Sequence, residues 1–261
     1  MEMTEKQIEK YLKRIGYAGN LELKGETLRK LQNAHLKSIP YENLDILNNI
    51  PLSLEKPDLF HKIIETRRGG YCFELNSLFC CLLKSLNFKV TNFLGRFIIG
   101  ESSIQMRRHR ILKVEAKDGT YLCDVGVRNE SPRTALIFAE NLLQTDGFSH
   151  YKFVKEDFWG WVLWQKEKGK EWTRLYGFTE EPQLDIDYIM PSFYCEKHPD
   201  SDMNKFMKIS IFTDTGRVSL VDRTLIISDG ANGLKQSTLE RSEEIIEVLK
   251  KYFGIITKLP D

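Results

Sequence analysis

The sequence predicts an α+β protein in which a helical first third is followed by a strand-rich middle and a mixed helical and strand-forming end. Up to about residue 88, apolar residues recur at intervals of three and four, as in helices that pack on a core. After residue 88, short runs rich in β-branched and aromatic residues alternate with turn signals, as in antiparallel sheets. We therefore divide the 261 residues into three consecutive parts, 1–88, 89–190 and 191–261.

Three helices are predicted before the first glycine pair of the chain. Thr4 and Gln7 form a capping box for the first helix, which closes near Gly16. The second helix spans residues 26–36, and the third begins at Pro57. The first part of the chain is therefore expected to be a helical bundle.

A fourth helix is predicted from Cys72 to about residue 86, after an extended segment at residues 39–46 and the third helix. The segment is expected to be extended because Pro40 disfavours helical backbone in the residue before it. The fourth helix has an apolar stripe that consists of Leu75, Leu78, Phe79, Leu82, Leu83 and Leu86. Cys72 lies on this stripe and is therefore expected to point inward.

The middle part contains runs typical of strands. They cover residues 89–93, 96–99, 110–116, 120–125, 151–154, 159–165 and 172–178. Together they suggest a small antiparallel barrel or sandwich.

The last part is predicted to begin with an irregular segment, residues 185–207, which contains two prolines. Three strands at residues 209–212, 218–221 and 223–228 follow. An amphipathic helix at about residues 245–253 ends the chain.

The composition narrows the class of protein. Lysine and arginine total 38 against 37 acidic residues, a balance that argues against nucleic acid or an anionic membrane as partner. No apolar run resembles a signal peptide or is long enough to cross a bilayer. The five cysteines show no paired spacing, so we expect a reduced, cytoplasmic protein. No metal site is expected, because neither Cys-x-x-Cys nor His-x-x-x-His spacing occurs.

The segment Arg68-Gly69-Gly70-Tyr71-Cys72-Phe73-Glu74-Leu75-Asn76 has the features of a nucleophile site. Two glycines permit a tight turn, and Cys72 follows where the helix begins. Unpaired N–H groups and the positive end of the helix dipole favour a thiolate over a thiol at this position. The alternative is that Cys72 is a small buried apolar residue that opens a core helix, as free cysteines usually are.

A base and a group that orients it are predicted on the strands that follow. His109 precedes the strand at residues 110–116, and Asp124 lies at the end of the next strand. A carboxylate is costly to bury without a partner, and a histidine N–H is a suitable one. A cysteine, a histidine and an aspartate in this order form the relay of thiol acyl-transfer enzymes. The alternative is that His109 caps a strand edge and Asp124 belongs to a turn.

The relay requires a particular register in the hairpin that joins these two residues. A tight turn at Asp118-Gly119, which the local sequence favours, would pair Lys117 with Thr120 and hold the histidine and the aspartate ~13 Å apart. A four-residue loop over residues 116–119, or a bulge, would pair Glu115 with Thr120 and make the two residues diagonal neighbours. We therefore predict the longer loop or a bulge.

Segment 68–76 resembles the active-site signature of the arylamine N-acetyltransferases, and segment 35–45 resembles that family's other N-terminal signature. His109 and Asp124 fall where the family keeps its histidine and aspartate. The similarity is strong over the first half of the chain and thin beyond Pro132. A further weak family pattern matches Phe193, His198, Pro199, Ser201 and Phe206.

The resemblance implies a helical bundle carrying Cys72, a β-barrel carrying His109 and Asp124, and a C-terminal α/β lid, with the three residues arranged as in cysteine proteases. It also implies a ping-pong reaction without a metal, in which an acetyl group passes from acetyl-CoA through a Cys72 thioester to an arylamine or arylhydrazine nitrogen. Glu42 and Arg68 would form a buried ion pair that fixes the glycine turn. Two solvated surface charges are the alternative for this pair.

One segment departs from the family pattern, which commonly continues the aspartate as Asp-Val-Gly-Phe-Gly. Here the chain has Val127 and Arg128 at the last two positions. The resemblance places Val127 at the acceptor pocket, where it replaces an aromatic ring. Arg128 would contact an acceptor carboxylate or a CoA phosphate, or else lie solvated in a loop. No glycine-rich nucleotide fingerprint locates a CoA site.

Two other functions remain open at the level of the sequence. Thiol hydrolases and transglutaminase-like enzymes use the same order of cysteine, histidine and aspartate, and pass the acyl group to water or to another amine. A catalytically dead binding protein would keep the cysteine as a structural residue. No motif defines the preferred acceptor, the oligomeric state or the biological role.

Overall fold

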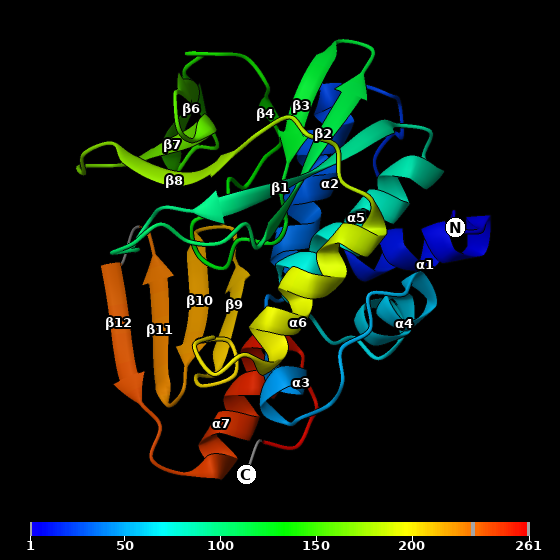
Figure 1. Ribbon diagram of the computed structural model, residues 1–261. Coiled ribbons are helices and arrows are strands. Elements are labelled where there is room, and N and C mark those ends of the chain that lie inside the picture. The colour runs from blue at the N-terminus through cyan, green and yellow to red at the C-terminus, as the bar shows by residue number, and fades with distance from the viewer. Residues whose placement is uncertain (1, 231–232, 260–261) are drawn as a thin grey trace.

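The computed structural model describes residues 2–230 and 233–259, which form helices around two antiparallel sheets. Figure 1 shows the larger sheet at the top, the smaller sheet below it and the N-terminal helices beside both. In the described ranges, no helix is both long and apolar enough to pass through a bilayer. The order of helical, strand-rich and mixed regions is the one that the sequence predicts.

The N-terminal region consists of five helices and one helical extension. Their bounds are α1 (Glu5–Arg14), α2 (Gly25–Ser38), α3 (Leu44–Leu47), α4 (Lys56–Phe60), its π-helical extension η1 (His61–Glu65) and α5 (Cys72–Ser85). The capping box of Thr4 and Gln7 is present at the start of α1. The short helix α3 is a correction, because it begins inside the segment predicted to be extended. Helix α5 is buried from Cys72 to Leu83, since other helices and the first two strands pack around it.

The larger sheet is an antiparallel barrel that is nearly closed. Its strands are β1 (Lys89–Phe97), β2 (His109–Ala116), β3 (Gly119–Cys123), β4 (Leu136–Ile137), β5 (Gln144–Thr145), β6 (Ser149–Glu156), β7 (Gly160–Glu167) and β8 (Thr173–Phe178), in the spatial order β4-β3-β2-β1-β8-β7-β6-β5. The two short end strands do not pair with each other, but the Gln144 side chain bonds to both backbone groups of Ile137. The two runs predicted at residues 89–93 and 96–99 form the single strand β1.

The β2–β3 hairpin has the predicted register but not the predicted loop. Glu115 pairs with Thr120, as the relay requires. Ala116 also pairs with Gly119, so the connection is a two-residue turn at positions 117–118 and not a four-residue loop. The turn lies one residue earlier than the local sequence suggests, and Gly119 adopts φ 146°. A shift of one residue at the turn is therefore sufficient to change the register, without a longer loop.

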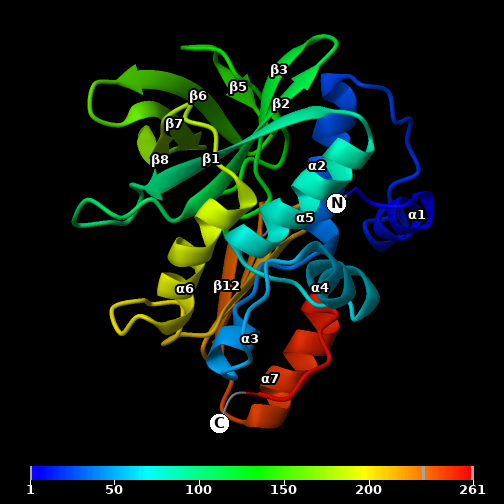
Figure 2. The same ribbon diagram turned by 45° about the vertical axis from the view of Figure 1, so that its right-hand side comes forward.

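The described part of the C-terminal region contains a four-stranded sheet, two α-helices and two short helical segments of other types. Its elements are η2 (Asp185–Tyr188), α6 (Ile189–Lys197), β9 (Lys208–Phe212), β10 (Gly216–Val221), β11 (Thr224–Asp229), β12 (Gly233–Thr238), α7 (Ser242–Val248) and the π-helical η3 (Leu249–Phe253). The prediction of an irregular segment at residues 185–207 is wrong for its first half, because η2 and α6 form there. Figure 2 shows α6 beside the barrel and the smaller sheet, and α7 at the foot of that sheet.

A short segment joins the small sheet to the glycine turn. Tyr41 exchanges two backbone hydrogen bonds with Ser210 of β9, and the N–H of Glu42 donates to the carbonyl of Gly70 at 2.8 Å. The start of α5, at Cys72, is therefore fixed against a strand whose Ser210 lies about 140 residues later in the sequence. This contact brings the N-terminal and C-terminal regions together around Cys72.

Candidate active site

Cys72 is the first residue of α5 and lines a cavity of about 140 Å³ between the three regions of the chain. The apolar part of the wall consists of Tyr41, Tyr71, Phe97 and Met203. The charged part consists of Glu101, Arg108, Arg128, Asp202 and Lys208, and a second thiol, Cys195, completes the wall. The nucleophile predicted from the sequence therefore lies at a cavity and not in a closed core.

The turn before Cys72 is held by an ion pair beneath it. The Arg68 guanidinium donates to both carboxylate oxygens of Glu42, at 2.8 and 3.0 Å, and Glu42 is fully buried. Glu42 also accepts from the N–H of Gly69. A Cβ atom at Gly69 would lie 2.0 Å from the carbonyl oxygen of Pro40, so only glycine fits. The predicted pair is thus present, and the alternative of two solvated charges is wrong.

This ion pair is part of a larger group of buried charges, Glu42, Asp45, Lys62, Arg68 and Glu74, which we call the support cluster. Lys62 lies 2.7 Å from both Asp45 and Glu74, and Arg68 contacts Asp45 at 2.8 Å. Burial alone would lower the pKa of Lys62, but the neighbouring carboxylates outweigh burial and raise it. Glu74 also accepts from the N–H of Tyr71, which caps the first turn of α5. The support cluster therefore fixes the start of the nucleophile helix.

His109 and Asp124 lie in direct contact, as predicted. The His109 Nε2 atom is 2.6 Å from Asp124 Oδ2, and both residues are buried. A carboxylate can only accept, so in the neutral imidazole Nε2 carries the hydrogen and Nδ1 has the lone pair. Nδ1 is buried and has no hydrogen-bond partner among the described residues. The rings of Phe97 and Tyr176 flank the imidazole at 4.6 and 5.1 Å between centroids.

Asn76 connects this pair to the nucleophile helix. It lies four residues after Cys72, on the same face of α5. Its amide nitrogen donates to Asp124 Oδ1 at 2.9 Å and to the carbonyl of Arg110 at 2.7 Å. Its oxygen accepts from the N–H of Val125 at 2.9 Å. Asn76 therefore sets the position of the aspartate relative to the cysteine, a role that the sequence analysis did not assign although the residue lies in the quoted signature.

Two further observations place the cysteine beside the histidine segment. The Cys72 Sγ atom lies 3.7 Å from the carbonyl oxygen of Arg108, the residue before His109. A Cβ atom at Gly126 would lie 2.7 Å from Cys72 Cα, so a side chain at position 126 would force the two segments apart. Gly126 also donates its N–H to Asp124. The structure thus brings Cys72 close to the two segments that carry His109 and Asp124.

The ionisation of Cys72 differs from the sequence-based expectation. Burial raises the pKa of the thiol well above its usual range, and Cys195 and Asp124 add to the increase. A backbone hydrogen bond at Arg110 and the guanidinium of Arg108 act in the opposite direction. Burial of the thiol therefore opposes the thiolate that the helix start was predicted to favour.

Of the two residues that depart from the family pattern, Val127 and Arg128, only Arg128 lines the Cys72 cavity. Val127 is buried in the barrel core with residues such as Leu122 and Leu136, and it does not line the Cys72 cavity. Arg128 lines the cavity. The sequence analysis also missed Cys195, which no motif or spacing relates to Cys72.

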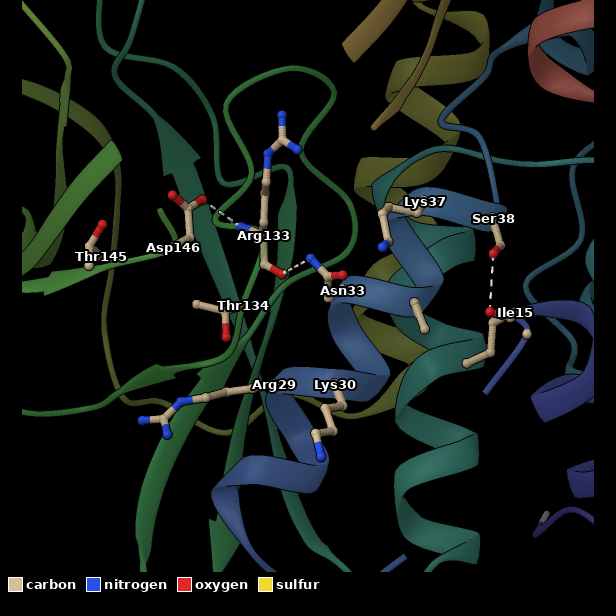
Figure 3. A pocket seen from close by; sticks show the side chains of 12 residues that line it. Ile15, Arg29, Lys30, Asn33, Lys37, Ser38, Arg133, Thr134, Thr145 and Asp146 are labelled. Carbon is tan, nitrogen blue, oxygen red and sulfur yellow. Dashed lines mark hydrogen bonds between the residues drawn. The ribbon is translucent and has the colours of Figure 1, made fainter. Parts of the chain in front are cut away.

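A second hollow of about 490 Å³ lies beside α2 (Figure 3), and the residues that line it differ from those of the Cys72 cavity. Its lysines form exposed ion pairs, Lys30 with Glu26 and Lys37 with Asp214, and the Arg133 guanidinium bonds to backbone carbonyls outside it. No cysteine or histidine lines it. Across residues 2–230 and 233–259, no group of three or more potential ligand side chains is placed to hold a metal ion.

The chain is similar to known acetyltransferases along most of its length. A family model described as N-acetyltransferase matches residues 25–260, so the likeness continues well beyond Pro132. An arylamine N-acetyltransferase of Mycolicibacterium smegmatis is 31% identical over 94% of this chain and 90% of its own length. The structure of the enzyme of that name from Salmonella typhimurium matches with a TM-score of 0.90 at 28% identity, over 97% and 92% of the two chains. The Mycobacterium marinum enzyme in complex with CoA matches with a TM-score of 0.88 at 29% identity, over 95% and 92%.

Proposed function

The chain belongs to the arylamine N-acetyltransferase family, and on this premise we propose that it transfers an acetyl group from acetyl-CoA to an arylamine or arylhydrazine through a thioester on Cys72. The single observation that carries the proposal is the combination of three features in neighbouring segments. Cys72 lines a cavity next to Arg108, His109 is bonded to Asp124, and the second ring nitrogen of His109 has no hydrogen-bond partner among the described residues.

In the first half of the reaction, the Cys72 sulfur attacks the thioester carbonyl carbon of acetyl-CoA. His109 Nδ1 takes the thiol proton, because its lone pair is free and Asp124 stabilises the imidazolium that forms. The bond between the carbonyl carbon and the CoA sulfur breaks, and the proton passes to the departing thiolate. The raised pKa of Cys72 suits this role for a base, since a protonated thiol needs a base to take its proton during attack.

In the second half, the amine nitrogen attacks the acetyl carbon on Cys72. His109 takes a proton from the nitrogen and returns it to the departing Cys72 sulfur, which restores the starting enzyme. A thioester suits this exchange, because forming it from another thioester costs little free energy and it stays reactive toward amines.

The cavity supports a flat, aromatic acceptor. Its lining includes the rings of Tyr41, Tyr71 and Phe97. Its volume of about 140 Å³ is close to the ~150 Å³ of an engineered cavity that takes up benzene. One aromatic ring therefore fits beside the cysteine, while larger substituents extend toward the opening.

We also propose that the segment after residue 191 acts as a lid, within the division into residues 1–88, 89–190 and 191–261. Asp202, Met203 and Lys208 come from this last part and line the same cavity as Cys72. The arrangement supports a lid because these residues limit the access of water to an acyl-enzyme.

Mass spectrometry of the acyl-enzyme tests the mechanism. Incubation with acetyl-CoA and no acceptor is expected to add one acetyl group, which peptide mapping finds on Cys72. Addition of an arylamine is then expected to remove the label and to release the N-acetyl product. A label on Cys195 or another cysteine, or no label, would contradict the proposal.

The same assay separates the alternatives. A thiol hydrolase would lose the acetyl group at the same rate with and without an arylamine. A binding protein without catalytic activity would show neither the label nor the consumption of acetyl-CoA, although its cysteine would still react slowly with iodoacetamide.

A further inference from the structure

Cys195 is a second thiol at the wall of the Cys72 cavity, and the proposed acetyl transfer gives it no role. It is 3% exposed and belongs to the same buried apolar cluster as Cys72, Tyr71 and Phe73. Both cysteines are free thiols. The other three cysteines, all within the described ranges, do not line the cavity. The cavity therefore presents two thiols to a small molecule that enters it.

The helix that carries Cys195 is bonded to the start of the nucleophile helix. The hydroxyl of Tyr71, the residue before Cys72, shares a hydrogen bond with the hydroxyl of Ser192 on α6. Cys195 lies three residues after Ser192 and thus one turn further along α6. Its carbonyl oxygen accepts from the Ser201 hydroxyl at 2.7 Å. Figures 1 and 2 both show α6 beside α5, so the two thiols lie on adjoining segments.

Arg108 interacts with both thiols. The Cys72 thiol donates to its carbonyl oxygen at 3.7 Å, and its guanidinium acts on the Cys195 thiol by charge and by a hydrogen bond. Burial raises the pKa of Cys195 to about 11, whereas the guanidinium lowers it and so favours the thiolate. Cys195 in turn adds to the raised pKa of Cys72, as two thiolates close together repel each other.

We infer that Cys195 is a resolving cysteine, which forms a reversible disulfide with Cys72 when a hydroperoxide oxidises the nucleophile. The inference rests on the proposed function, because it uses the same base, His109, to take the Cys72 proton. The disulfide halts acetyl transfer until a dithiol reduces it. It also protects Cys72 from further oxidation to sulfinic and sulfonic acids, which dithiols do not reverse.

The reaction balances with one hydroperoxide for each disulfide. The Cys72 sulfur attacks the terminal peroxide oxygen, the O–O bond breaks, and the thiol proton passes through His109 to the departing oxygen, which leaves as water or an alcohol. Cys72 is then a sulfenic acid. The Cys195 sulfur attacks the Cys72 sulfur, the S–O bond breaks, and the departing hydroxide leaves as water with the Cys195 proton. Two thiols are oxidised by two electrons, and the peroxide is reduced.

Peptide mapping of the complete chain tests the inference. The protein is reduced, freed of reductant, treated with hydrogen peroxide and then blocked with N-ethylmaleimide. Digestion without reductant is expected to give one cross-linked peptide that contains Cys72 and Cys195. Acetylation of Cys72 by acetyl-CoA is expected to be lost on treatment and restored by dithiothreitol. A disulfide needs Cα atoms about 4.4–6.8 Å apart, so the cross-link also reports how closely the two segments approach.

Cys195→Ala is the critical variant. Without Cys195, dimedone is expected to trap Cys72 as a sulfenic acid, and excess peroxide to carry it to the sulfinic acid. Each protein is compared with its own untreated sample. The fraction of acylation that dithiothreitol restores is expected to be about tenfold lower in this variant than in the wild type. Cys80→Ala is the matched control, because it removes another buried thiol that does not line the cavity, and it is expected to behave as the wild type.

A cross-link between Cys72 and Cys195 in the wild type, with reversibility lost in Cys195→Ala, supports the inference. It is overturned if peroxide gives the wild type no such cross-link, or if dithiothreitol restores Cys195→Ala as fully as the wild type. Failure of the proposed function gives a different result, because the reduced, untreated wild type would then take no acetyl label from acetyl-CoA. The cross-link is identified by its peptide mass and does not depend on that label.

Discussion

Two groups of buried charged and polar side chains lie close to Cys72, and they differ in how fully they are paired. In the support cluster every carboxylate has a cation partner, and Glu42 and Glu74 also accept from backbone N–H groups of the glycine turn. At the cavity, Arg108 Nε and Arg128 Nη1 are buried without a hydrogen-bond partner in the described residues, and so is Nδ1 of His109, the residue after Arg108.

The difference separates groups that stabilise the fold from groups that are available for substrate. A fully paired cluster can be buried at little cost and holds its segment in one geometry, whereas an unpaired buried atom lowers stability until a ligand satisfies it. Functional sites are where such cost is tolerated. We therefore expect substitutions at the cavity to change activity, and substitutions in the support cluster to change the free energy of unfolding.

The largest effect is expected at the nucleophile. Cys72→Ser should lower turnover by about 10⁴-fold or more, because a serine hydroxyl is much less ionised than a thiol and loss of a nucleophile commonly has an effect of this size. The thermal unfolding midpoint should change little, since the substitution replaces one atom at the cavity wall. A strong loss of stability in this variant would contradict the division between the two groups.

Asp124→Asn should have the next largest effect. An asparagine can present its amide to His109 Nε2 as donor or acceptor, so it no longer fixes the tautomer with a lone pair on Nδ1. We expect acylation of Cys72 by acetyl-CoA to slow by about 10³- to 10⁴-fold, as in other relays of this kind. Rapid-quench measurement of the acyl-enzyme checks this. An acylation rate close to that of the wild type would show that the aspartate only supports the fold.

Arg68→Met should destabilise the fold by about 3–5 kcal/mol, because it leaves the buried Glu42 carboxylate without its cation. Urea unfolding measures the change. The control is the double variant Glu42→Gln with Arg68→Met, in which the unpaired buried charge is removed together with its partner. It is expected to recover part of the loss, and a double variant less stable than Arg68→Met would contradict the role of the ion pair.

The smallest effect concerns His35 in the helical core. This residue is an exception to the division between paired supporting groups and unpaired groups at the cavity. Its Nε2 atom is buried without a hydrogen-bond partner among the described residues, although it does not line the Cys72 cavity. Burial, with a contribution from Arg14, lowers the pKa of His35 to about 3. The native protein keeps it neutral, whereas the unfolded chain takes up a proton near pH 6.5, so stability falls as the pH drops from ~6.5 toward 3.

As the pH falls from 6.5 to 4.5, this difference in proton uptake lowers the free energy of unfolding by about 2–3 kcal/mol. The glutamine in the His35→Gln variant does not take up a proton in this range. The free energy of unfolding of this variant should therefore fall by about 2–3 kcal/mol less than that of the wild type. Urea unfolding of both proteins at the two pH values tests the prediction. The same pH dependence in both would show that other groups are responsible, and the acylation rate per folded molecule should be similar in the two proteins.

Local pattern was sufficient to predict most helices and strands. The apolar stripe of α5 and the strand runs of the barrel were recognised because their periods of about four and two residues are properties of short segments. The segment at residues 185–207 was misjudged because α6 has little one-sided apolar pattern, with Met190 and Phe193 exposed on it. Strand β12 was missed because all its residues are exposed and give no alternation.

The sequence by itself determined the order of cysteine, histidine and aspartate, the glycine turn and the start of the nucleophile helix, because each depends on residues close together in the chain. Only the tertiary structure decided that burial raises the pKa of Cys72, that Val127 lies in the barrel core and that Arg128 Nη1 has no hydrogen-bond partner among the described residues. Pairing and desolvation depend on distances between segments far apart in the sequence, such as residues 72, 128 and 202. No local pattern records those distances.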